Sequence, residues 1–122
     1  MEPVIGTFEV RPGGDGVAVL SIDGDVTPAS EPALMHAYGA ATTTGARAIV
    51  LDFASLAYMN SGGIGLLVTL LVRVQRGKQR LLACGLNDHY RQILTLTRLD
   101  EAIAVHPTLD QAITAAREGA AR

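Results

Sequence analysis

Two short apolar runs on either side of one long helical segment place the strongest constraint on the fold of this chain. Residues 48–51 (AIVL) and 81–84 (LLAC) lack the alternation of apolar and polar residues that marks a half-exposed strand. Such runs are typical of strands covered on both faces. Between them, Ser61–Arg76 has apolar residues at helical spacing and is followed by Gly77. This succession predicts a parallel sheet flanked by helices.

The segment before the first buried run predicts a hairpin and a helix. Residues 4–10 and 17–22 are β-prone, and the turn-forming residues 11–16 between them indicate an antiparallel hairpin. Thr27 is suited to cap a helix through its side-chain oxygen, and the proline that follows it is favoured in a first helical turn. That helix is expected to run toward residue 44 and to end at the following glycine.

The rest of the chain continues the alternation of strands and helices. In chain order we expect a loop at residues 54–60, a helix capped by Asn87, a strand at residues 103–105 and a final helix whose capping box is Thr108 and Gln111. The whole chain, residues 1–122, is therefore predicted to form one α/β domain. Its sheet is mixed but mostly parallel, with about four to five strands that begin in a hairpin, and it packs against four helices.

Composition and charge exclude several classes of function. Hydrophobic residues make up 48% of the 122 residues, which is enough for a hydrophobic core, and the net charge of −2 provides no basic surface for nucleic acid. The single cysteine, Cys84, has no partner for an internal disulfide and cannot alone hold a structural zinc. The N-terminus does not resemble a signal peptide, and no apolar stretch is long enough to cross a bilayer. We expect a cytoplasmic protein without membrane insertion, cofactor or metal.

The residues that begin the long helix are the main candidates for a functional site. Asn60 or Ser61 is suited to cap the helix, and Gly62 lets a partner approach its unpaired backbone N–H groups. An anion could bind there, but the capping role is the simpler interpretation. A serine hydrolase using Ser61 with His89 is disfavoured, because Met59 stands where a nucleophile elbow requires glycine.

The apolar residues of the long helix do not all fit one stripe. On a wheel of about 100° per residue, the predicted core stripe leaves Leu66 and Leu70 on roughly the opposite side, near Thr69. Two interpretations remain open: neighbouring helices cover these leucines, or they form a surface on which another protein docks. The residues of the predicted core stripe are Ile64, Leu67, Val68, Leu71 and Val74.

Several segments resemble the motifs of one known family. Residues 58–65 (YMNSGGIG) are similar to the signature [FY]-[MI]-D-S-[ST]-G-[LI]-G of the STAS domain, the fold of bacterial anti-sigma factor antagonists. Residues 22–26 (IDGDV), 50–53 (VLDF) and 81–86 (LLACGL) are similar to other conserved parts of that domain. The resemblance covers nearly the whole chain and implies a STAS-type fold.

The resemblance also implies a binding function that is not enzymatic. Family members bind an anti-sigma factor, often a serine kinase of histidine-kinase-like type, and so release the sigma factor. The corresponding docking surface in this chain is expected to comprise Asp25, Thr27, Asn60, Ser61, Gly62, Leu66 and Thr69. An alternative role is a STAS scaffold or subunit in a larger signalling or transporter assembly.

One departure from the signature concerns regulation. In the family, the kinase phosphorylates a serine or threonine at the position of Gly62, and the added charge of about −1.5 to −2 breaks the complex. Gly62 has no hydroxyl, and Asn60 replaces the usual aspartate. Either Ser61 is phosphorylated instead, or the protein binds without being switched, or it has a role unrelated to sigma factors. We favour loss of the usual switch with partner binding retained.

Overall fold

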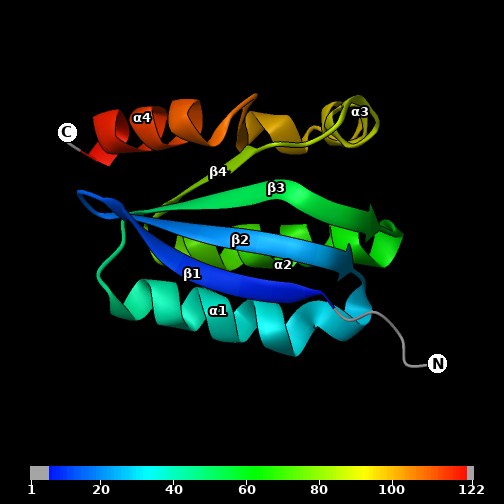
Figure 1. Ribbon diagram of the computed structural model, residues 1–122, viewed down its shortest axis with the longest axis horizontal. Helices are drawn as coiled ribbons and strands as arrows, with labels where there is room; N and C mark the ends of the chain where they lie inside the picture. The colour runs from blue at the N-terminus through cyan, green and yellow to red at the C-terminus, as the bar shows by residue number, and fades with distance from the viewer. Residues whose placement is uncertain (1–5, 121–122) are drawn as a thin grey trace.

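The computed structural model describes residues 6–120, and these form a five-stranded sheet in the order β1-β2-β3-β4-β5 (Figure 1). Strand β1 pairs antiparallel with β2, and the other neighbours are parallel. The predicted α/β class and mixed, mostly parallel sheet are confirmed. The strands are β1 (Thr7–Gly14), β2 (Val17–Val26), β3 (Ala48–Met59), β4 (Arg80–Cys84) and β5 (Ala104–His106). The helices are α1 (Glu31–Thr43), α2 (Ser61–Arg76), α3 (Asp88–Leu96) and α4 (Leu109–Ala120), with short 3-10 turns η1 (Pro28–Ser30) and η2 (Leu99–Glu101).

The predicted N-terminal hairpin is present, with a shorter turn than expected. Asp15 and Gly16 have φ values of 46° and 78°, which suits the tight Asp-Gly turn of a two-residue hairpin. The strands consequently extend to Gly14 on one side and begin at Val17 on the other. The first residues of the strand predicted at 4–10 lie outside the described residues.

The loop predicted at residues 54–60 is wrong, because β3 continues to Met59. Pairing between β3 and β4 stops at Asp52 and Cys84, whereas β2 stays paired to β3 as far as Val26 and Met59. Two irregularities in the β2–β3 register accompany this extension. The extension has a neighbouring strand on one side only and is largely exposed, so the pattern expected of a strand covered on both faces does not identify it.

The sheet separates two apolar layers. Helices α1 and α2 cover one face, and α4 covers part of the other (Figure 1). On the α4 side, Ala112 and Ala116 pack against sheet residues that include Val19, Val50 and Cys84. The larger layer also contains Tyr90 and Leu94 of α3, so α3 is anchored in the same core as α2.

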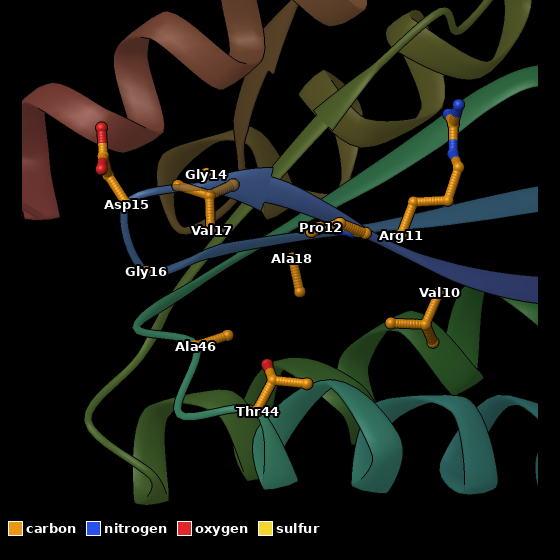
Figure 2. Close-up of a pocket in the computed structure, with 10 residues that line it drawn as sticks. All are labelled: Val10, Arg11, Pro12, Gly14, Asp15, Gly16, Val17, Ala18, Thr44 and Ala46. Atoms are coloured by element: carbon orange, nitrogen blue, oxygen red, sulfur yellow. The ribbon is translucent and has the colours of Figure 1, made fainter.

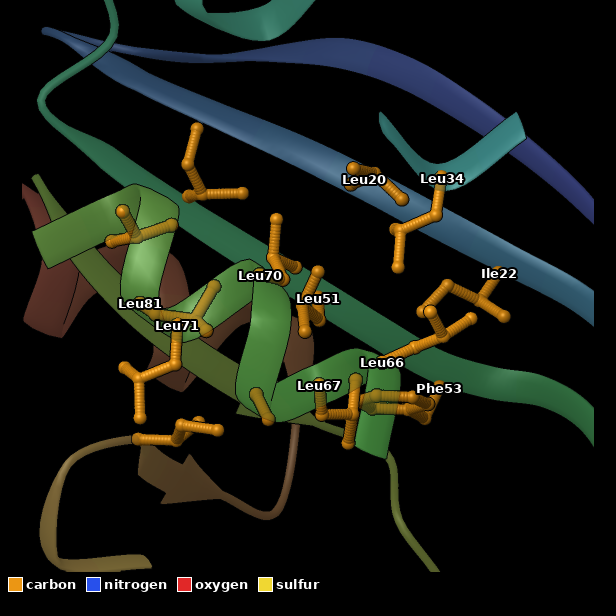
Figure 3. Close-up of a cluster of buried hydrophobic side chains, with 14 of the residues drawn as sticks. Leu20, Ile22, Leu34, Leu51, Phe53, Leu66, Leu67, Leu70, Leu71 and Leu81 are labelled. Atoms are coloured by element: carbon orange, nitrogen blue, oxygen red, sulfur yellow. The ribbon is translucent and has the colours of Figure 1, made fainter. Parts of the chain in front are cut away.

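The predicted orientation of α2 is wrong. Leu66 and Leu70 are 4% and 0% exposed, whereas Val68, which was placed in the core stripe, is 42% exposed. Figure 3 shows Leu66 and Leu70 within the cluster of sheet and α1 side chains that includes Leu34. The buried face of α2 is therefore rotated by roughly 60° from the prediction, at 100° per residue. A helical wheel does not include α1, which lies beside α2 and covers the flank that carries both leucines.

Helix starts were predicted more accurately than strand ends. The Asn87 side-chain oxygen accepts a hydrogen bond of 3.0 Å from the backbone N–H of Tyr90 at the start of α3. The Thr108 hydroxyl oxygen accepts one of 3.2 Å from the backbone N–H of Gln111 at the start of α4. The helix predicted after Thr27 begins with the 3-10 turn η1 and continues as α1.

Candidate functional site

The start of α2 is held in place by the side chain of Asn60. Its backbone is extended, with φ −92° and ψ −178°, and its Oδ1 accepts a hydrogen bond of 2.8 Å from the N–H of Gly63. Its carbonyl oxygen accepts the first helical bond, from Ile64 at 3.0 Å. Asn60 is therefore the N-cap, and it satisfies one of the backbone donors that a helix start leaves unpaired.

The end of β2 lies directly against this helix start. The backbone N–H of Asn60 donates to the carbonyl oxygen of Val26 at 3.4 Å. A β carbon on Gly63 would lie 2.9 Å from the carbonyl carbon of Val26 and closer still to its oxygen. Because real β carbons essentially never come within 3.0 Å of such atoms, this close approach requires glycine at position 63.

A compact turn follows β2 and brings Asp25 and Thr27 to the same end of the sheet. The Ser30 side chain is 2% exposed, and its hydroxyl donates to the carbonyl oxygen of Asp25 at 3.3 Å. The hydroxyl oxygen of Ser30 in turn accepts a bond of 3.1 Å from the N–H of Thr27. The N–H of Ser30 completes the turn with a bond of 2.8 Å to the carbonyl oxygen of Thr27. Buried Ser30 thus fixes the turn by three hydrogen bonds.

The structure brings together most of the residues predicted for the docking surface. Ser61 and Thr69 are exposed, and the other polar members and Gly62 are half-buried around the helix start. Leu66 does not belong to this surface, because its side chain lies in the core and cannot contact a partner. The half-buried members are Asp25, Thr27, Asn60 and Gly62.

Sequence reasoning missed two exposed apolar residues on α2. Val68 and Val72 are 42% and 41% exposed and lie one helical turn apart. With Ser61, Gly65 and Thr69 they form the solvent-facing side of the helix, which we call the α2 outer face. The sequence signal that could have identified them is the repeated leucine pair at residues 66–67 and 70–71. If these four leucines define the buried face of the helix, Val68 and Val72 fall on the exposed face.

The remaining reactive groups do not form a catalytic site. Cys84 is buried, and this burial raises the pKa of its thiol to about 12, with a smaller contribution from the nearby Asp52 carboxylate. The nucleophilic thiolate is therefore suppressed at neutral pH. The ring of His89 packs edge-on against Tyr90, and no hydrogen bond joins it to Ser61 within the described part of the chain. Between residues 6 and 120, no group of three or more His, Cys, Asp or Glu side chains is placed to hold a metal ion.

A described cavity lies at the opposite end of β3 from the α2 start. It has a volume of about 420 Å³ and lies between the hairpin turn and the end of α1 (Figure 2). Its lining includes Asp15, Gly16, Thr44 and Ala46, which are near the beginning of β3, whereas α2 follows the end of that strand. Ligands of open α/β sheets bind at the carboxyl ends of the parallel strands, so this cavity is not at the usual position.

Among residues 6–120, no helix has the length and apolar character needed to span a membrane.

Comparison with known proteins agrees with this arrangement. A family profile described as "Mlab, STAS domain" matches residues 12–109. Anti-sigma-F factor antagonist RsfB of Mycobacterium tuberculosis is 30% identical over 106 residues, which are 86% of this chain and 85% of that protein. The crystal structure of an anti-sigma factor antagonist from Mycobacterium paratuberculosis has a TM-score of 0.77 at 29% identity, with 92% of this chain and 94% of that chain covered.

A second structural likeness concerns the fold alone. A sulfate transporter family protein from Wolinella succinogenes has a TM-score of 0.73 at 18% identity, over 84% of this chain and 86% of that chain. At this identity the likeness gives no support to a transporter role. The more similar relatives are named as antagonists of anti-sigma factors, which act by binding and not by catalysis. The matched residues and the shared sheet and helices show that this chain belongs to the STAS domain family.

Proposed function

We propose that this chain is a regulatory binding module of the anti-sigma factor antagonist type, which docks on an anti-sigma factor of the serine-kinase class. The observation that carries the proposal is the α2 outer face, where two exposed valines follow a helix start without acidic residues. The chain acts as one STAS unit in the cytoplasm, and the names of its relatives support the same role.

The α2 outer face has the composition expected at the centre of a protein interface. Val68 and Val72 provide apolar area, and Gly65, one helical turn before Val68, lets the backbone of a partner approach closely. Burying the exposed part of each valine contributes on the order of 1 kcal/mol. Thr69 beside the valines and Ser61 at the helix start supply a polar rim. The half-buried turn residues Asp25 and Thr27 continue the surface onto the end of β2.

Docking in this chain proceeds without the usual phosphorylation switch. Gly62 occupies the position of the family's acceptor and offers no hydroxyl. Ser61 is exposed as the first residue of α2, so its hydroxyl is the remaining candidate acceptor. We retain the interpretation in which the protein binds its partner and is not switched by the partner's kinase activity.

Co-purification with the anti-sigma factors encoded in the same genome tests the proposed function. A complex with one of these proteins, which persists after incubation with Mg·ATP and leaves Ser61 unmodified by mass spectrometry, is the expected result. Failure of every candidate to form a complex would contradict the docking role. A phosphate on Ser61 accompanied by release of the partner would instead contradict the loss of the switch.

A further inference from the structure

Gly62 has no room for a side chain because Pro28 occupies the space. A β carbon built on Gly62 would lie 2.7 Å from Cδ of Pro28 and closer still to Cγ. Its next neighbour would be the capping oxygen of Asn60 at 3.4 Å, which is an ordinary contact. The obstacle is therefore one proline ring, reaching across from η1 to the first turn of α2.

The ring cannot turn aside as a flexible side chain would. Its closure fixes φ, so its position follows the backbone of η1. That backbone is tied by the bonds of Ser30 to Asp25 and Thr27. A side chain at position 62 would have to displace this turn, which carries two residues of the proposed docking surface.

Neighbouring glycines of α2 show that this restriction is specific to one position. Gly65 has open space around it, so a side chain there meets nothing. Gly63 faces the backbone of Val26, which no single substitution can remove. Of the two glycines that are obstructed, only Gly62 has no backbone atom among its close obstacles, so its restriction can be lifted by changing Pro28.

We propose that Pro28 and Gly62 are a coupled pair in which Pro28 excludes any side chain at position 62, so that a single substitution cannot restore a hydroxyl at the position of the family's acceptor. This inference rests on the proposed function for its regulatory meaning, but the coupling is a property of the folded chain. The loss of the switch is consequently fixed by two residues. A serine at position 62 fits only when residue 28 is small.

A double-mutant cycle on the purified full chain tests the coupling. Gly62→Ser is expected to raise the unfolding equilibrium constant by about tenfold to a hundredfold, as forced overpacking does. Pro28→Ala in that background should recover most of this loss, giving strong coupling between the two changes. Pro32→Ala and Gly65→Ser, on exposed positions of α1 and α2, form the control cycle and should be additive. Additive effects of Pro28→Ala and Gly62→Ser would overturn the proposal.

Two further variants keep the test decisive. If Gly62→Ser does not fold with either residue at position 28, the cycle is repeated with Gly62→Ala, where absence of coupling overturns the proposal. For regulation, Pro28→Ala should retain the co-purified anti-sigma factor, and Pro28→Ala with Gly62→Asp should lose it through the added charge. Retention by both variants would overturn the regulatory part. Absence of any partner would refute the proposed function and leave the result of the unfolding cycle standing.

Discussion

The hydroxyl oxygen of Tyr90 on α3 accepts a hydrogen bond of 2.9 Å from the backbone N–H of Met59, the last residue of β3. Tyr90 is 8% exposed and Met59 is 4% exposed, so water does not readily replace this bond. The bond holds the residue immediately before Asn60 and thereby helps to fix the position at which α2 begins. A helix distant in sequence thus supports the proposed docking surface from behind.

Tyr90→Phe is expected to destabilise the chain by about 1–3 kcal/mol, because the N–H of Met59 is left buried without a partner. Urea unfolding followed by circular dichroism measures this loss. Tyr58→Phe is the control, since Tyr58 is 51% exposed and its hydroxyl forms no hydrogen bond with residues 6–120. Equal stability of the two variants would show that the buried bond has no structural role.

Asn60→Ala is expected to lower the free energy of unfolding by about 1 kcal/mol through loss of the N-cap of α2. Asn60→Asp, which introduces the aspartate usual in the family, keeps the acceptor and adds favourable charge near the helix start. It should match or exceed the stability of the wild type at neutral pH and low salt. Thermal unfolding of the three proteins compares them, and a fully stable Asn60→Ala would rule out the capping role.

Gly63→Ala and Gly65→Ala should change stability in opposite directions. Alanine at position 65 stabilises α2 by about 0.5–1 kcal/mol, because it has open space and a better helix propensity. Alanine at position 63 must push β2 and α2 apart and should cost about 1–3 kcal/mol or more. Urea midpoints give both values. Stabilisation by alanine at position 63 would be incompatible with the packing of Gly63 against Val26.

Stability should fall at alkaline pH through Cys84. Burial and Asp52 raise the pKa of the folded thiol from 9.0 to about 12. The contribution of the neutral thiol is therefore complete below pH 9 and is lost as pH rises from 9 toward 12. Between pH 9 and pH 10 the wild type should lose about 1 kcal/mol more than Cys84→Ser, whose hydroxyl does not ionise. Parallel pH profiles of the two proteins would contradict this assignment.

Local patterns in the sequence were sufficient to predict the class of fold and most helix starts. The buried runs at residues 48–51 and 81–84 identified two central strands, and Asn87 and Thr108 marked helix starts by their side-chain chemistry. These signals depend on residues close in sequence, so no knowledge of the tertiary structure is needed to use them.

Features that depend on distant segments could not be predicted in the same way. The orientation of α2 depends on α1 beside it, which is why Leu66 was assigned to the surface and Val68 to the core. The extension of β3 to Met59 depends on pairing with β2. The contact of Pro28 with position 62 joins residues far apart in the chain, and neither residue alone reveals it.

The central claim is tested most directly by calorimetry. The measurement compares how tightly the anti-sigma factor recovered by co-purification binds the wild type and Val68→Glu. A charge in the middle of the α2 outer face should weaken binding at least tenfold, because glutamate would be desolvated against an apolar partner surface. Thr114→Glu, on an exposed position of α4 across the sheet, should bind like the wild type. Unchanged affinity of a folded Val68→Glu would contradict docking through the start of α2.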